Sequence, residues 1–157
     1  MFPSEAIQVL ERSPSRVVIL EPPYYSMGIW LFFLALLFGA AAAFLFYKGF
    51  LPALGIMFGL VVLGLGVFGT YLMTSKRLIT VSRADGLLEV RTSSFGRTRV
   101  EGTLALDQVR KVVVENNRYA NSLVVVKKSG EALSLDNGTN REGYYGAAEA
   151  INELLGP

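Results

Sequence analysis

Two long stretches without a charged side chain constrain this sequence more than any other feature. They cover residues 22–47 and 49–75 and are separated only by Lys48. Each is longer than the roughly 20 apolar residues that a helix needs to cross a bilayer. We therefore predict two transmembrane helices, over 28–47 and 50–73. Because the link between them is so short, the helices must be antiparallel neighbours.

The distribution of basic residues predicts how this hairpin is oriented. Lys48 is the only basic residue at the turn, whereas five flank the opposite ends of the helices: Arg12, Arg16, Lys76, Arg77 and Arg83. Because basic residues accumulate on the cytoplasmic side of membrane proteins, we expect both termini and the polar remainder of the chain to be cytoplasmic. The expected location is the bacterial inner membrane, or a thylakoid or intracytoplasmic membrane.

Small residues recur in both apolar stretches at intervals of about four residues: Ala35, Gly39 and Ala43 in the first, and Gly55, Gly59 and Gly66 in the second. Small side chains let helix backbones approach closely. Two interpretations stay open, because these residues could pack the hairpin against itself or present a face to the helices of another membrane protein. Neither predicted helix contains Asp, Glu, Lys, Arg, Asn or Gln, so nothing in them indicates a proton relay or an ion path.

The composition removes most catalytic chemistry. The 157 residues include no cysteine and no histidine, which excludes thiolate and imidazole zinc sites, disulfides and histidine-based catalysis. The 15 basic and 13 acidic residues are interspersed, so no basic stripe indicates nucleic-acid binding. Asp136, Asn140 and Glu142 resemble a calcium loop only faintly, and their spacing does not fit an EF-hand. We expect no catalytic residue, no cofactor and no metal.

After Ser75 the apolar residues alternate with polar ones, a pattern typical of half-buried strands. The predicted strands are 16–21, 77–82, 87–92, 97–104, 110–115, 121–127 and 131–135. Their expected inward-facing residues are Ile79, Val81, Leu88, Val90, Val112, Val114, Leu123, Val125, Leu133 and Leu135.

An amphipathic helix is predicted over 141–155, with Thr139 and Glu142 as a capping box and Gly156 at its end. One of Tyr144 and Tyr145 must lie off its buried stripe. The predicted fold class is α+β, with about seven short antiparallel strands and a C-terminal helix. The predicted domains are an N-terminal segment (1–27), a transmembrane hairpin (28–73) and a β domain (74–157).

Two loops carry candidate contact residues. The turn RTSSFGRTR sets Phe95 among Arg91, Arg97 and Arg99, which suits anionic headgroups or an acidic partner. A solvated turn with outward-facing arginines is the alternative. Arg118 and Tyr119 lie in the polar segment 116–121 and are residue types enriched at interfaces, although an ordinary structural loop explains them equally.

The strand segments GLLEVRTSSFGRTRVEGTLALDQVRKVVVE and SLVVVKKSGEALSL, followed by the helix AAEAINELLG, resemble bacterial pleckstrin-homology-like (PH-like) domains. In many of these a transmembrane pair directly precedes the barrel. The arrangement over residues 15–155 is also similar to the photosystem I assembly factor family of cyanobacteria and chloroplasts. The resemblance implies a non-enzymatic module that binds protein or lipid at a membrane surface, as an accessory subunit or assembly factor of a larger complex. The alternative is a lipid-sensing or regulatory protein that reads anionic headgroups without a fixed partner.

Overall fold

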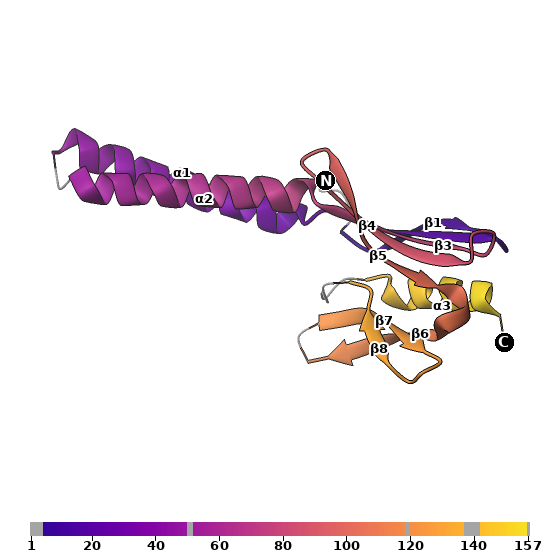
Figure 1. Ribbon diagram of the computed structural model, residues 1–157. Coiled ribbons are helices and arrows are strands. Elements are labelled where there is room, and N and C mark those ends of the chain that lie inside the picture. The colour runs from indigo at the N-terminus through magenta and orange to yellow at the C-terminus, as the bar shows by residue number, and fades with distance from the viewer. Residues whose placement is uncertain (1–4, 50–51, 119, 137–141, 157) are drawn as a thin grey trace. The chain divides into compact units, whose positions relative to one another are not determined.

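A computed structural model describes residues 5–49, 52–118, 120–136 and 142–156, and the chain divides into two compact units. The first unit contains residues 23–75 and is a helical hairpin. The second combines residues 4–22 with residues 76–157 and contains all the strands (Figure 1). The segment before the helices therefore folds together with the segment that follows them.

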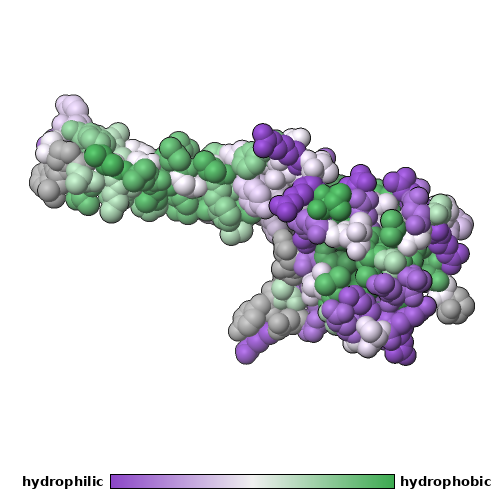
Figure 2. Space-filling model, in the orientation of Figure 1, coloured by the Kyte–Doolittle hydropathy of each residue, from purple (hydrophilic) through white to green (hydrophobic). Residues whose placement is uncertain are grey.

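The hairpin consists of α1 (Tyr25–Tyr47) and α2 (Pro52–Thr74). Both helices are long and apolar enough to cross a membrane, as the sequence predicts. Only 11% of the most apolar window of each helix is buried. Figure 2 shows apolar side chains along the visible surface of the hairpin. The helices therefore bury little of their apolar surface against each other.

Small residues form much of the contact between α1 and α2. A Cβ atom on Gly28 would overlap the Met73 side chain, and one on Gly55 would overlap the Phe46 ring. Ala35 and Ala42 are buried at the same contact. Ala43 is exposed and takes no part in this contact, so of its two interpretations only the face toward another membrane protein stays open. Successive helical residues point about 100° apart, and the helix turns Ala42 inward instead.

The second unit contains two antiparallel sheets. The first has the order β1-β2-β3-β4-β5, formed by β1 (Gln8–Arg12), β2 (Arg16–Glu21), β3 (Lys76–Ser82), β4 (Leu87–Ser94) and β5 (Arg97–Ala105). The second has the order β6-β7-β8, formed by β6 (Val109–Asn117), β7 (Ala120–Lys127) and β8 (Ala132–Ser134). A short 3-10 helix, η1 (Leu106–Gln108), joins the two sheets.

The sequence predicts seven strands, and the structure has eight in its described part because β1 was missed. All five β1 residues are exposed. Their sequence, QVLER, lacks the alternation of apolar and polar residues that indicates a half-buried strand. Its pairing with β2 contains a bulge between Val9 and Glu11. The turn that follows is held by Ser13, whose hydroxyl donates to the Arg16 carbonyl oxygen at 3.0 Å. Tertiary pairing, not local pattern, creates this strand.

One hydrophobic core joins the two sheets. It includes Ile79, Val81, Leu88, Val90, Val112, Leu123, Val125 and Leu135, all predicted to face inward and all buried. Val114 is partly buried against the core. Leu133 lies on the core face as predicted, because it pairs with the buried Val125, but 41% of that residue is exposed. Leu133 lies in β8, which has only three residues and pairs with β7 alone in the described structure, so no further strand covers it.

The C-terminal helix α3 (Tyr144–Leu155) begins later than predicted. Its N-cap is Gly143 with φ +98° and no side-chain cap, so the predicted capping box is wrong; Thr139 lies outside the described residues. A Cβ atom on Gly143 would overlap the Ile7 carbonyl oxygen, and the Ile7 N–H donates to the Glu142 carbonyl at 2.9 Å. Gly156 is the C-cap, as predicted. Tyr144 is buried and Tyr145 is 66% exposed.

α3 covers one side of the sandwich, where it packs against β6, β1 and β2. Figure 1 shows α3 running between the two sheets. The Val112 N–H donates to Asn152 Oδ1 at 2.8 Å, and Asn152 Nδ2 donates to the Val112 carbonyl at 2.7 Å. Because β6 is the edge strand of its sheet, this side-chain amide satisfies backbone groups that a neighbouring strand would otherwise pair. We call this the α3 side of the sandwich.

Candidate functional site

The turn between β4 and β5 presents an aromatic ring at its apex. Ser94 pairs with Arg97, which leaves Phe95 and Gly96 as a two-residue loop. Their φ angles are +49° and +73°, as a type I′ turn requires at both central positions. Phe95 is the only residue other than glycine with positive φ in the described chain, and this conformation costs a side-chain-bearing residue about 1 kcal/mol. The turn thus holds a 53% exposed ring in a strained backbone position.

Two arginines accompany Phe95, and the third predicted arginine points elsewhere. Arg97 and Arg99 are exposed and two residues apart, so they share one face of β5. In the described structure neither forms an ion pair. Arg91 pairs with Val100 and therefore lies on the opposite face of the hairpin from Arg99. The turn site consists of Phe95, Arg97 and Arg99.

Arg91 already has an acidic partner on its own strand. Its Nη2 atom donates to Glu89 Oε2 at 2.8 Å. This hydrogen bond and the negative charge of Glu89 raise the pKa of the Arg91 guanidinium above its ordinary value. Arg91 is thus less available to an outside anion than the two arginines on β5.

The second predicted pair does not join this site. Arg118 is exposed in the turn between β6 and β7, which belongs to the other sheet. Tyr119 lies outside the described residues. The two loops therefore belong to different sheets.

The strand register places the turn site at a particular end of its sheet. Lys76, the first residue of β3, pairs with Ser93, so the turn extends beyond the start of β3. Only Ser75 separates β3 from the end of α2. At the same end, Glu21 of β2 pairs with Arg77, and the chain continues from Glu21 toward α1. The turn site lies at the end of the sheet from which the chain passes into both apolar helices.

The hairpin divides the predicted small residues into two groups. Gly39 and Gly55 each have a side chain of the other helix within 4 Å of the position that a Cβ would occupy, and Ala35 is buried. Gly59 and Gly66 have no described atom within that distance. Gly69, which the sequence analysis did not single out, approaches the Gly28 carbonyl and the Phe32 ring. α2 therefore uses some of its glycines within the hairpin and leaves others open.

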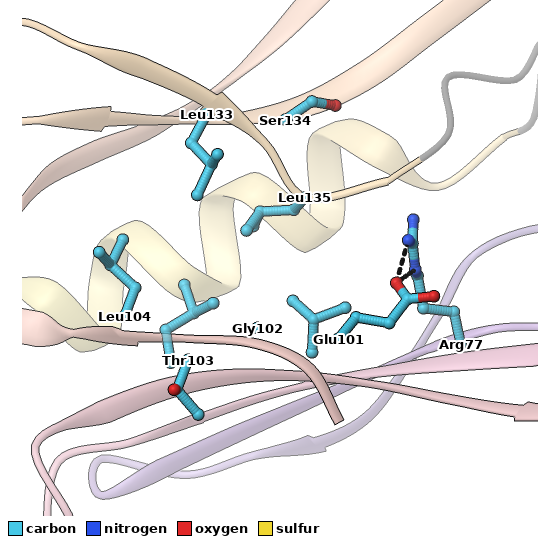
Figure 3. A pocket seen from close by; sticks show the side chains of 10 residues that line it. Arg77, Glu101, Gly102, Thr103, Leu104, Leu133, Ser134 and Leu135 are labelled. Atoms are coloured by element: carbon cyan, nitrogen blue, oxygen red, sulfur yellow. Dashed lines mark hydrogen bonds and ion pairs between the residues drawn. The ribbon is translucent and has the colours of Figure 1, made fainter. Parts of the chain in front are cut away.

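Sequence reasoning missed a cavity of about 190 Å³ between β5 and β8. Leucine side chains, among them Leu104, Leu133 and Leu135, line much of it, and an Arg77–Glu101 ion pair also lies in its wall (Figure 3). Alternation identifies the strands that contribute these residues, but it does not tell which strand edges meet. No sequence signal could have located this cavity.

The ion pair sets the protonation of Glu101. Arg77 Nε donates to Glu101 Oε2 at 3.0 Å. Partial burial raises the pKa of Glu101, but the hydrogen bond and charge of Arg77, together with smaller contributions from neighbours that include the charge of Arg99, outweigh it, so the pKa lies below its ordinary value. Glu101 is therefore ionised near neutral pH and carries no proton to donate.

Acidic residues do not assemble into a metal site within the described ranges, where no three potential ligands group together. Asp136 is buried, and its Oδ2 accepts a hydrogen bond from the Leu123 N–H at 3.1 Å. Asn140 lies outside the described residues. Asp136 thus has a structural task in joining β7 to the segment after β8.

No family model matches this chain, and no curated protein matches it.

Proposed function

We propose that this chain is a non-catalytic docking module that α1 and α2 anchor in a membrane. In this proposal the β unit is a PH-like domain on the cytoplasmic side, together with both termini. The module serves a larger membrane complex as an accessory subunit or assembly factor, photosynthetic complexes being one class. Its partners are integral membrane proteins and the surrounding lipid. The two long apolar helices and the resemblance to PH-like domains support this proposal.

The open glycines of α2 carry the docking role. Gly59 and Gly66 lie about 20° apart around the helix, because seven residues make nearly two full turns. A glycine inside a helix costs about 0.5–1 kcal/mol relative to alanine, and no contact among the described residues of the hairpin requires it at these two positions. A second helix could approach this backbone closely, which is how helices associate in lipid. The glycine face of α2 (Gly59 and Gly66) is therefore the proposed docking surface for another membrane protein.

Native purification in mild detergent tests this role. We expect the wild-type chain to migrate within a larger assembly, and Gly59→Leu with Gly66→Leu to reduce its share in that assembly at least tenfold, because bulky side chains hold the partner helix away. Gly64→Leu is the matched control: Gly64 also has open space around it but points about 140° away from Gly59. A wild-type monomer, or an assembly that retains the double variant, would contradict the proposal.

The turn site favours a second candidate function, the sensing of anionic lipid. Each cation near an anionic surface contributes about 1 kcal/mol, and Arg97 and Arg99 flank an exposed ring that could enter the headgroup layer. A Phe95→Trp chain in a Trp30→Phe background, reconstituted in nanodiscs, would report this contact by its fluorescence.

For lipid sensing we expect a blue shift with phosphatidylglycerol that neutral lipid does not produce and that high salt reverses. Arg97→Gln with Arg99→Gln should remove the shift, whereas Arg118→Gln in the other sheet should not. A spectrum independent of lipid charge would reject lipid sensing. It would leave the docking role to the purification experiment.

A further inference from the structure

The side of the sandwich opposite α3 lies between β5 and β8. It has two strand edges without a partner in the described structure. β5 pairs only with β4, and β8 pairs only with β7. Residues 97–103 of β5 are all exposed. We call this the β5–β8 side. Unpaired N–H and C=O groups along an edge strand form a template for another strand.

The cavity lies against this edge. Its lining includes buried core residues, Leu88 and Val90, and the exposed Leu133 of β8. Gly102 of β5 also lines it, and no described atom lies within 4 Å of the position that a Gly102 Cβ would occupy. The cavity is therefore an opening into the core beside unpaired backbone, large enough for one apolar side chain.

The charges along β5 restrict what could pair with it. Arg97 and Arg99 stand near one end of the edge, and neither has an ion pair among the described residues, although the charge of Arg99 acts on Glu101 two residues along β5. A second copy of β5 in parallel register would bring its own arginines beside these two, which like-charge repulsion disfavours. In antiparallel register its Glu101 would face Arg99, but that carboxylate is already paired with Arg77. A lipid tail could fill the cavity but offers no hydrogen bonds to the strand. An extended polypeptide with acidic residues could hydrogen-bond to the unpaired backbone groups of β5 and also place negative charge beside the two arginines.

We propose that an extended segment of a partner protein adds to β5 as a sixth strand of its sheet, with one apolar side chain in the cavity and acidic residues beside Arg97 and Arg99. Strand addition of this kind takes affinity from main-chain hydrogen bonds and specificity from side-chain pockets. The inference rests on the docking role proposed above and names the chemistry of the partner.

A selection from a phage-displayed library of linear peptides, against the full chain in nanodiscs, tests this inference. Enriched peptides should share one large apolar residue with acidic residues to one side of it. Binding of a synthetic enriched peptide should slow hydrogen exchange of β5 amides at least tenfold, a result that filling the cavity alone would not produce.

Two substitutions and one control locate the peptide. Leu133→Ser and Gly102→Leu should each weaken binding at least tenfold, the first by removing an apolar wall and the second by filling the cavity. Leu87→Ser should leave binding unchanged, because Leu87 has the same 41% exposure as Leu133 but does not line the cavity.

Several results would overturn the inference: a selection without binders, binders that leave β5 exchange unchanged, or equal effects of all three substitutions. Mass spectrometry that finds a lipid whose retention depends on Leu133 would assign the cavity to lipid instead. An assembly that survives Leu133→Ser but is lost with the Gly59 and Gly66 substitutions would overturn strand addition while the docking role stands.

Discussion

The two sides of the β sandwich differ in whether their edge strands are covered. On the α3 side, the edge strand β6 is covered by a helix whose Asn152 pairs with both backbone groups of Val112. On the β5–β8 side, the edge strand β5 has no such cover in the described structure, and a cavity opens beside it. The fold thus protects one edge within its own chain and leaves the other available.

This difference shows where the stability of the unit resides. Tyr144, Ala147, Ile151 and Leu154 of α3 are buried in the common core, whereas Leu133 on the opposite side is 41% exposed. Burial of a large apolar side chain contributes about 1.5–3 kcal/mol. The buried side chains of α3 therefore contribute more to the stability of the unit than the half-exposed Leu133 does.

The largest expected effect comes from Ile151→Ala. Ile151 is fully buried, and its truncation leaves a cavity that costs about 2–5 kcal/mol. Leu133→Ala on the other side should cost less than about 1 kcal/mol, because much of that side chain is already in solvent. Denaturant unfolding in mild detergent, followed by the strand signal in circular dichroism, measures both. Equal losses would erase the distinction between the two sides.

Asn152→Ala tests whether the amide protects the β6 edge. The substitution leaves the N–H and C=O groups of Val112 without their partner, and we expect a loss of about 1–3 kcal/mol. Glu149→Ala, at an exposed position on the same helix, is the control and should change stability by less than about 0.5 kcal/mol. Faster exchange of the Val112 amide in the Asn152 variant would show that the edge itself has opened. Unchanged exchange would contradict that role.

The smallest expected effect concerns the ion pair at the β5–β8 cavity. Because the folded pKa of Glu101 lies below its unfolded value, the pair stabilises the fold above the unfolded pKa. This stabilisation is lost as the pH falls through the folded pKa.

Glu101→Gln should therefore reduce stability at neutral pH by about 0.5 kcal/mol, since the pair is partly exposed, and make no difference in strong acid. Unfolding midpoints at neutral and acidic pH measure this change. Glu115→Gln, at an exposed site without an ion pair in the described structure, should behave as wild type at both. If Glu101→Gln reduced stability equally at neutral pH and in strong acid, the ion pair would not be the cause of the loss.

The alternation of apolar and polar residues predicted the strands correctly wherever every second side chain is buried. Ile79 and Val81 alternate with polar neighbours, and both are buried as expected. The same rule assigned Leu133 to the core face but could not predict its 41% exposure, because alternation does not say whether another strand covers a face. In the helices, four-residue spacing identified Gly55 at the contact but also selected Ala43, where the structure buries Ala42. The candidate turn site was located by sequence, although register later separated Arg91 from it.

The sequence by itself determined the two apolar helices and the alternating strands, because composition and period act over a few neighbouring residues. Only the tertiary structure decided which strand edges are covered. Asn152 meets Val112 forty residues away along the chain, and residues of β5 and β8 line one cavity. Such pairings depend on how distant segments pack, and no local pattern records them.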